Sequence, residues 1–303
     1  MNTTASTLVH TATDGPQLSR IVAGAWRMTD WKLSIAERQR WIEQCVELGV
    51  TSFDHADIYG NYGVEAQFGE ALAAAPGLRD RIQIVTKCGI KLVSGARPQH
   101  ALKSYDSSRA HVMASVDNSL AALKTDYIDL LLIHRPDLLM DVGELAATFK
   151  DLRAAGKVRH FGVSNFTPSQ FALLNRRIPL ATNQIELSPL HHAPLQDGTL
   201  DQCQDLGVRP MIWSPLAGGK LFSSGTDQSL RTLAKISDIA HRYGVEPATI
   251  VYAWILRHPA RPLPITGSRR IELVREAVAA LSLELDADSW YAILSAAAGH
   301  EVP

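Results

Sequence analysis

The stretch YIDLLLIHRPDLLMDVGELAATFKDLRAAGKVRHFGVSN, residues 127–165, contains one complete strand–helix–strand pattern. It opens with an apolar run that suits a buried strand, and a segment with apolar residues three and four positions apart follows. Gly156 then ends the expected helix, and a second apolar run begins directly after it. Strands that alternate with helices in this way predict an α/β fold with a parallel sheet.

The same alternation recurs along most of the chain. Eight runs suit strands: LSRIVAG (18–24), TSFDHA (51–56), IQIVTKCG (82–89), YIDLLLIH (127–134), RHFGVSN (159–165), ATNQIELS (181–188), RPMIWSPL (209–216) and PLPITGS (262–268). Several of the expected helices between them end at a glycine: Gly49, Gly156, Gly207 and Gly244. Eight strand–helix units in about 280 residues are typical of a single (β/α)8 TIM barrel. A doubly wound sheet is the alternative, but the chain lacks the GxGxxG motif that usually accompanies it.

Composition favours one globular domain without a charged partner. The chain has 303 residues, 46% of them hydrophobic, and a net charge of −1. With a net charge this small, the chain has no overall electrostatic attraction for a nucleic acid or an anionic membrane. No apolar run approaches the ~18 residues of a membrane helix. The three cysteines lack CxxC spacing, which favours free thiols in a reducing compartment. We therefore expect a cytoplasmic protein, monomeric by default, with a polar N-terminal segment (residues 1–17) followed by one barrel domain (residues 18–303).

A barrel predicts polar side chains at the C-terminal ends of its strands, because active sites of this fold lie there. The sequence meets this expectation at strand after strand. The residues at or just after the expected strand ends, most of them polar, are Asp54, Tyr59, Lys87, His134, Ser164, Asn165, Asn183, Gln184, Trp213, Ser214, Gly267 and Ser268. Solvation of individual loops does not explain why polar residues recur at the same position of each strand–helix unit.

Four of these residues, Asp54, Tyr59, Lys87 and His134, could form a proton relay. A tyrosine has a reference pKa of about 10, and a nearby ammonium stabilises its phenolate. A carboxylate behind the lysine keeps the lysine charged, and a histidine alongside orients a carbonyl oxygen. Such chemistry on an alcohol also needs a hydride, which implies a nicotinamide cofactor. The residues also allow simpler interpretations: a buried Asp54–Lys87 ion pair, a core histidine and an aromatic turn at Tyr59.

The order of motifs resembles the aldo-keto reductase family from about Leu18 to the C-terminus. The matching motifs are FDHADIYG, IVTKCG, LLLIHRPD, GKVRHFGVSNF, ATNQIELSPL and PITGSRRIELVREA. The motifs HADIYG and LLLIHRPDLLMD are most similar to those of the bacterial general oxidoreductase branch. The resemblance implies a (β/α)8 barrel in which Tyr59 is the general acid for carbonyl reduction. It implies that Lys87 lowers the pKa of Tyr59, that Asp54 pairs with Lys87, and that His134 orients the substrate carbonyl.

The resemblance also implies a cofactor site. Ser164, Asn165 and Gln184 would bind the nicotinamide carboxamide, and Trp213 would stack on the ring. Ser214, Leu216 and Gly218 would line the diphosphate. In the motif GSRRIELVREA, which begins at Gly267, Ser268 and Arg269 would bind the 2′-phosphate of NADPH and Glu276 the adenine amino group. Leu273 and Ala277 depart from the family pattern beside the adenosine, so NAD(H) remains the alternative cofactor.

The sequence therefore predicts NADPH-dependent reduction of a small aldehyde or ketone. One alternative is an NADP-binding sensor or regulatory subunit of the same fold. A second is a metal-dependent barrel hydrolase with Asp54, His55 and His134 as ligands, although no HxH or HExxH spacing supports it. Strand alternation points His55 away from Asp54, toward the helices, so packing is the expected role of His55. We expect no metal site.

Overall fold

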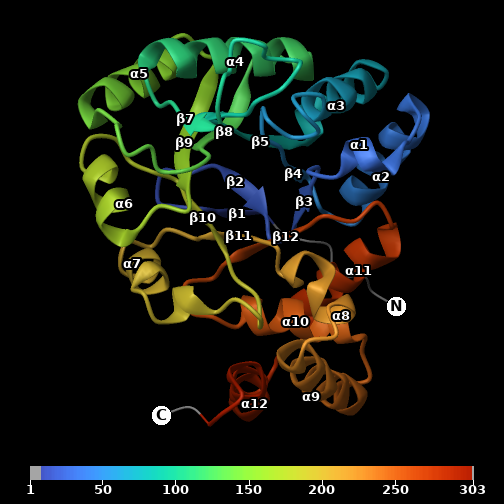
Figure 1. The fold of residues 1–303 in the computed structure, drawn as a ribbon. Helices are drawn as coiled ribbons and strands as arrows, with labels where there is room; N and C mark the ends of the chain where they lie inside the picture. Colours follow the sequence, from blue (N-terminus) through green and yellow to red (C-terminus); the bar gives the residue numbers. More distant parts are fainter. Residues whose placement is uncertain (1–7, 302–303) are drawn as a thin grey trace.

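The computed structural model describes residues 8–301, in which eight parallel strands close into a barrel (Figure 1). Around the barrel the strands are β3 (Val22–Gly24), β4 (Ser52–Asp54), β5 (Gln83–Cys88), β8 (Ile128–Ile133), β9 (Val158–Ser164), β10 (Asn183–Glu186), β11 (Met211–Trp213) and β12 (Leu263–Thr266). Each of the eight expected runs contributes one of these strands. The prediction of a (β/α)8 barrel is confirmed.

Helices surround the barrel as an outer ring (Figure 1). The longer ones are α2 (Ile35–Glu47), α3 (Val64–Ala73), α4 (Arg109–Leu123), α5 (Val142–Ala154), α6 (Pro168–Asn175), α7 (Thr199–Asp205), α9 (Asp227–Tyr243), α10 (Pro247–Leu256), α11 (Ile271–Ala279) and α12 (Ala287–Ala298). Two short helices, α1 (Met28–Trp31) and α8 (Lys220–Ser223), follow β3 and β11.

Local sequence explains where these helices begin and end. Ser34 and Glu37 form a reciprocal capping box at the start of α2, and the Asp141 carboxylate accepts two backbone N–H groups at the start of α5. The four glycines expected at helix ends all have positive φ, for example 74° at Gly49 and 65° at Gly244. This left-handed conformation costs glycine little, so each helix stops there and the chain turns toward the next strand.

A two-stranded antiparallel hairpin, β1 (Leu8–His10) and β2 (Gln17–Ser19), precedes the barrel. Its Leu18 side chain is fully buried and packs in the barrel interior with Val22, Val85 and Leu130. The hairpin therefore covers the N-terminal end of the barrel, and the boundary expected between residues 17 and 18 falls inside β2. The single strand expected over residues 18–24 is two strands, because Ser19 turns to pair with Ser52 before β3 begins. Part of the expected N-terminal segment, residues 1–7, lies outside the described residues.

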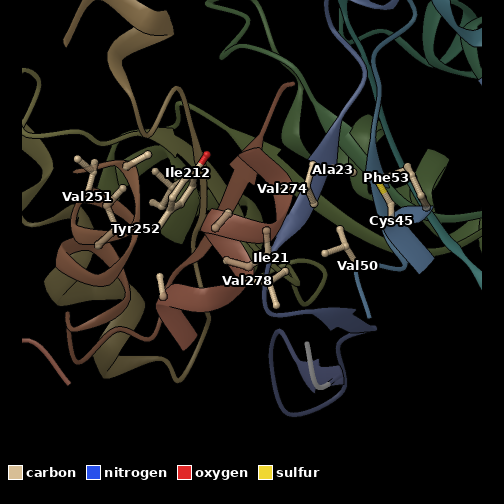
Figure 2. Close-up of a cluster of buried hydrophobic side chains, with 14 of the residues drawn as sticks. Ile21, Ala23, Cys45, Val50, Phe53, Ile212, Val251, Tyr252, Val274 and Val278 are labelled. Atoms are coloured by element: carbon tan, nitrogen blue, oxygen red, sulfur yellow. The ribbon is translucent and has the colours of Figure 1, made fainter. Parts of the chain in front are cut away.

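The main hydrophobic core lies between the barrel and its helices. Figure 2 shows Phe53 of β4, Ile212 of β11, Tyr252 of α10 and Val274 of α11 among the side chains of this layer. Each of these four side chains is at most 2% exposed. The cysteines, Cys45, Cys88 and Cys203, are all buried and free, as expected, and burial raises the pKa of Cys203 to about 12. Within residues 8–301, no helix has the length and apolar character needed to cross a bilayer.

Candidate active site

Lys87 is the centre of a cluster of polar groups at the C-terminal ends of β4 and β5. The side chain is fully buried, and its Nζ lies 2.7 Å and 2.8 Å from the two carboxylate oxygens of Asp54. The same ammonium donates to the backbone oxygen of His55 at 2.8 Å and to the Tyr59 hydroxyl at 3.0 Å. An ammonium has three protons, so the three acceptor groups account for all of them.

These contacts keep the lysine charged although it is buried. Burial alone lowers the pKa of Lys87, but Asp54 and Tyr59 outweigh it, and the pKa is raised above its ordinary value. The ammonium can therefore act as a permanent hydrogen-bond donor to the phenol at any ordinary pH. The structure brings together the ion pair and the tyrosine that the sequence placed on neighbouring strands.

A tight turn aims Tyr59 at this ammonium. Gly60, Asn61 and Tyr62 have positive φ values of 55°, 58° and 68°, which bend the chain back directly after Tyr59. A Cβ atom at Gly60 would lie 2.3 Å from the Thr29 hydroxyl oxygen, so the turn packs closely against α1. The close approach leaves no room for a side chain at this position, and glycine adopts the positive φ at little cost.

The pKa of Tyr59 departs from the simple expectation. Burial raises it above its ordinary value, and although Lys87 lowers it, the effect of burial is larger. Lys87 acts on the pKa in the predicted direction, and burial outweighs it, so the net shift is upward. The phenol consequently stays protonated at neutral pH, which is the form a proton donor requires.

His134 lies beside the phenol at the end of β8. Its ring centroid is 5.8 Å from that of Tyr59, with an interplanar angle of 75°. Burial lowers the pKa of His134 well below its ordinary value, and the charges of Lys87, Arg135 and Lys103 add to this effect. The imidazole is therefore neutral, and its buried Nδ1 has no hydrogen-bond partner within the described chain. A neutral imidazole carries one ring proton, and the tautomer with that proton on Nε2 can donate it to a carbonyl oxygen.

Gln184 makes a contact that the sequence did not indicate. Its side-chain amide donates to Asp54 Oδ1 at 2.8 Å, across the barrel from β10 to β4. Asp54 therefore receives hydrogen bonds from both Lys87 and Gln184, and all three groups are at most 3% exposed. In this arrangement the Gln184 amide nitrogen is engaged with the relay, whereas the resemblance implied that it binds the carboxamide.

Ser164, Asn165 and Trp213 form a chain of hydrogen bonds on the next strands. The Trp213 indole N–H donates to Asn165 Oδ1 at 3.0 Å, and the Asn165 amide nitrogen donates to Ser164 Oγ at 2.7 Å. Ser164 Oγ in turn donates to the Gln184 backbone oxygen at 2.9 Å. The indole N–H thus fixes the orientation of the Asn165 side chain: Oδ1 faces Trp213, and the amide nitrogen faces Ser164.

The loop after β11 has an unusual backbone. Ser214, Ala217, Gly218 and Gly219 have φ values of 52°, 52°, 65° and 97°. A Cβ atom at Gly219 would meet nothing within 4 Å, so the backbone there borders open space. Arg27 donates to the Gly218 backbone oxygen at 3.1 Å and ties this loop to the loop after β3.

The segment after β12 is held mainly through its backbone. The Trp41 indole donates to the Ser268 backbone oxygen at 3.1 Å, and the Arg269 guanidinium donates to the Trp31 backbone oxygen at 3.3 Å. Gly267 and Arg269 are exposed, and a Cβ at Gly267 would meet nothing within 4 Å. Glu276 is half-buried on α11, and burial followed by the charges of Glu246 and Glu272 raises its pKa. Ala277 is fully buried in the core, so it does not face the same surface as Glu276.

Two polar residues between Asp54 and Tyr59, His55 and Asp57, are buried outside this cluster. His55 is fully buried against Phe68 of α3, with ring centroids 4.3 Å apart, as the alternation predicts. Burial lowers the pKa of His55 to about 3. Asp57 is buried near Glu65, and burial together with the Glu65 charge raises its pKa well above the ordinary range. Among residues 8–301, no group of three His, Cys, Asp or Glu side chains has an arrangement that could hold a metal ion.

The fold and these groups define a barrel oxidoreductase, and comparison with known proteins identifies its family. The model of the aldo/keto reductase family matches residues 20–298, and the chain belongs to that family. It is an oxidoreductase that acts on carbonyl or CH–OH groups, as the resemblance predicted. Among solved structures, a glycerol dehydrogenase from Gluconobacter oxydans is similar in fold, with a TM-score of 0.83 at 23% identity over 99% of this chain and 97% of that one.

Bacterial relatives are similar over nearly their whole length. Oxidoreductase YdhF from Escherichia coli (strain K12) is 52% identical over 295 residues, covering 96% of this chain and 98% of the relative. A 6-dehydroglucose reductase from Agrobacterium fabrum (strain C58 / ATCC 33970) is 44% identical over 292 residues, covering 95% of this chain and 97% of the relative. The expected similarity to bacterial oxidoreductases is confirmed.

Proposed function

We propose that this chain reduces a small aldehyde or ketone to the alcohol with NADPH, by reversible hydride transfer in which Tyr59 supplies the proton. The observation that carries the proposal is the hydrogen bond of 3.0 Å between Lys87 Nζ and Tyr59 Oη, with the Asp54 carboxylate behind the ammonium. A bound nicotinamide cofactor supplies the hydride. The side chains of the barrel rim bind and orient the carbonyl and deliver the proton.

Each member of the relay has a separate task. The Tyr59 hydroxyl gives its proton to the carbonyl oxygen as that oxygen becomes an alcohol. The Lys87 ammonium stabilises the phenolate left behind, which it can do because Asp54 keeps it charged. The neutral His134 donates from Nε2 to the same carbonyl oxygen and fixes its direction.

The cofactor would extend from the relay across the loops after β9, β10, β11 and β12. The residues we propose to hold it are Ser164, Asn165, Gln184, Trp213, Ser214, Leu216, Gly218, Gly267, Ser268, Arg269 and Glu276. Gly219 and Gly267 support this fit. The backbone at both residues borders open space, so a phosphate group can approach it closely. Backbone amides in positive-φ turns are also suited to anions.

The substrate class is supported by the relatives. Two of them, from Agrobacterium fabrum (strain C58 / ATCC 33970) and Novosphingobium aromaticivorans (strain ATCC 700278 / DSM 12444 / CCUG 56034 / CIP 105152 / NBRC 16084 / F199), are named as 6-dehydroglucose reductases and share 44% and 38% identity with this chain. We therefore include an aldehyde derived from a sugar among the substrates proposed. The buried free thiols support a reducing, cytoplasmic compartment, in which we propose a monomer acting on a free small molecule.

A substrate panel tests this function. Aliphatic, aromatic and sugar-derived carbonyl compounds are supplied with NADPH or NADH, and loss of the absorbance of the reduced cofactor is followed. We expect turnover of at least one carbonyl class, with NADPH preferred. Binding of NADPH without turnover of any class would favour a sensor over an enzyme.

Arg269→Glu should weaken the preference for NADPH. A guanidinium that pairs with the 2′-phosphate contributes roughly 1.5–3 kcal/mol, so the KM for NADPH should rise about 10–100-fold, while the KM for NADH changes little. Initial rates at varied cofactor concentration give both constants. Arg270→Glu makes the same charge change one residue along on an equally exposed side chain and should leave the ratio near that of the parent. An unchanged ratio in Arg269→Glu would reject the phosphate role.

A further inference from the structure

Three arginines stand at the N-terminal end of the barrel, opposite the rim that carries Tyr59. Arg20, Arg209 and Arg261 each precede a strand by two residues: β3, β11 and β12 begin at Val22, Met211 and Leu263. These strands are neighbours in the barrel, in the order β11, β12, β3. The register pairs Met211 with Leu263 and Ile265 with Val22, so the three arginines lie along one arc of the same end.

Neighbouring strands bring the three positive charges to the same end of the barrel, where each disfavours the charged form of the others. Burial lowers the pKa of Arg20, and the charges of Arg209 and Arg261 lower it further. Burial and the charge of Arg261 lower the pKa of Arg209 in the same way. A carboxylate nearby would act in the opposite direction.

No carboxylate neutralises this cluster within the described residues. None of the three arginines makes an ion pair there, and the buried Nε of Arg20 has no hydrogen-bond acceptor. On the other side of the same barrel end, a carboxylate neutralises two arginines. There Arg79 and Arg159 share the Asp129 carboxylate, at 2.8 Å and 3.3 Å.

Arg261 lies in a turn that precedes β12. Its φ is 53°, and its N–H donates to the His258 backbone oxygen.

We propose that Arg20, Arg209 and Arg261 form a binding site for a compact oxyanion of phosphate type, separate from the cofactor site. A guanidinium presents parallel N–H donors that match two oxygens of a phosphate, and three of them surround a dianion with complementary charge. The bound anion would relieve the repulsion among the three groups. The proposal does not depend on the reaction at the opposite rim.

Thermal unfolding in phosphate tests the site. The wild-type chain is unfolded in about 20 mM inorganic phosphate and in chloride of the same ionic strength. A ligand present at about ten times its Kd should raise the unfolding midpoint by roughly 3 °C. In Arg209→Gln, Arg261→Gln and the double variant we expect the phosphate-specific shift to fall below about 1 °C. Because repulsion is removed, the variants should be at least as stable as the wild type in chloride.

Two control variants separate this site from others. Arg81→Gln removes an exposed arginine that also stands two residues before a strand, β5, and it should keep the full shift. Arg269→Gln removes the arginine proposed for the 2′-phosphate, and it should keep the shift as well. The proposal is overturned if the wild type shows no phosphate-specific shift, if the double variant keeps it, or if Arg269→Gln abolishes it. Calorimetric titration with phosphate of the wild type saturated with NADP⁺ should give one site, and absence of binding would also overturn the proposal.

Discussion

Tyr59→Phe is expected to lower the turnover number by about 10²–10⁴-fold, while the chain stays folded and keeps its affinity for the cofactor. The substitution removes only the hydroxyl that lies 3.0 Å from the Lys87 ammonium. The ring remains and can still pack against His134. The loss should therefore appear in the turnover number rather than in the KM for NADPH, and steady-state kinetics with fluorescence titration of NADPH measures both.

Tyr62→Phe is the matched control for this prediction. Tyr62 lies three residues along the same turn, and its hydroxyl accepts a hydrogen bond from the Leu92 backbone N–H. It has no contact with Lys87 among the described interactions, so its variant should keep most of the turnover. If Tyr59→Phe stays within about threefold of the wild type, Tyr59 is not the proton donor.

Lys87→Met should remove turnover and also destabilise the fold. The Asp54 carboxylate is 3% exposed, and loss of its cation leaves a buried charge unpaired, at a cost of roughly 3–5 kcal/mol. Because the pKa of Lys87 is raised in the folded chain, its stabilising contribution is complete below about pH 10.4. That contribution is lost only as the pH rises through the folded pKa. The deficit in the free energy of unfolding, measured in urea, should accordingly still be present at about pH 9.

The double variant Asp54→Asn/Lys87→Met separates the two effects. It removes the orphaned charge, and the new amide side chain can still accept a hydrogen bond from Gln184, so most of the lost stability should return. Turnover should remain about 10²–10⁴-fold low, because no ammonium stabilises the phenolate. Recovery of turnover with recovery of stability would show that Lys87 only neutralises Asp54.

The barrel and the members of the relay follow from local sequence. Apolar runs such as residues 128–133 and glycines such as Gly156 are short-range signals, and the strands and helix ends appear where these signals stand. Alternation at the end of β4 and in the residue after it is equally local, and it places Asp54 against Lys87 and His55 against Phe68. The order of eight such units then brings the strand ends to one rim.

Contacts between distant residues could not be predicted in this way. Gln184 and Asp54 are 130 residues apart in the chain, and their hydrogen bond depends on both side chains pointing into the closed barrel. The net rise in the pKa of Tyr59 depends on how deeply the folded chain buries the phenol, which no motif specifies. The loop after β5 also contains an unexpected antiparallel pair, β6 (Ile90–Lys91) and β7 (Ser104–Tyr105). Its two strands have only two residues each, too few for a periodic signal.

The central claim is that the rim of the barrel transfers a hydride and a proton to a carbonyl carbon and oxygen. NADPH that carries deuterium at both C4 positions tests it most directly, with the best carbonyl substrate of the panel and mass spectrometry of the alcohol. We expect one carbon-bound deuterium in each alcohol molecule and one cofactor oxidised per alcohol formed. An alcohol without deuterium, or formed without oxidation of the cofactor, would contradict the account.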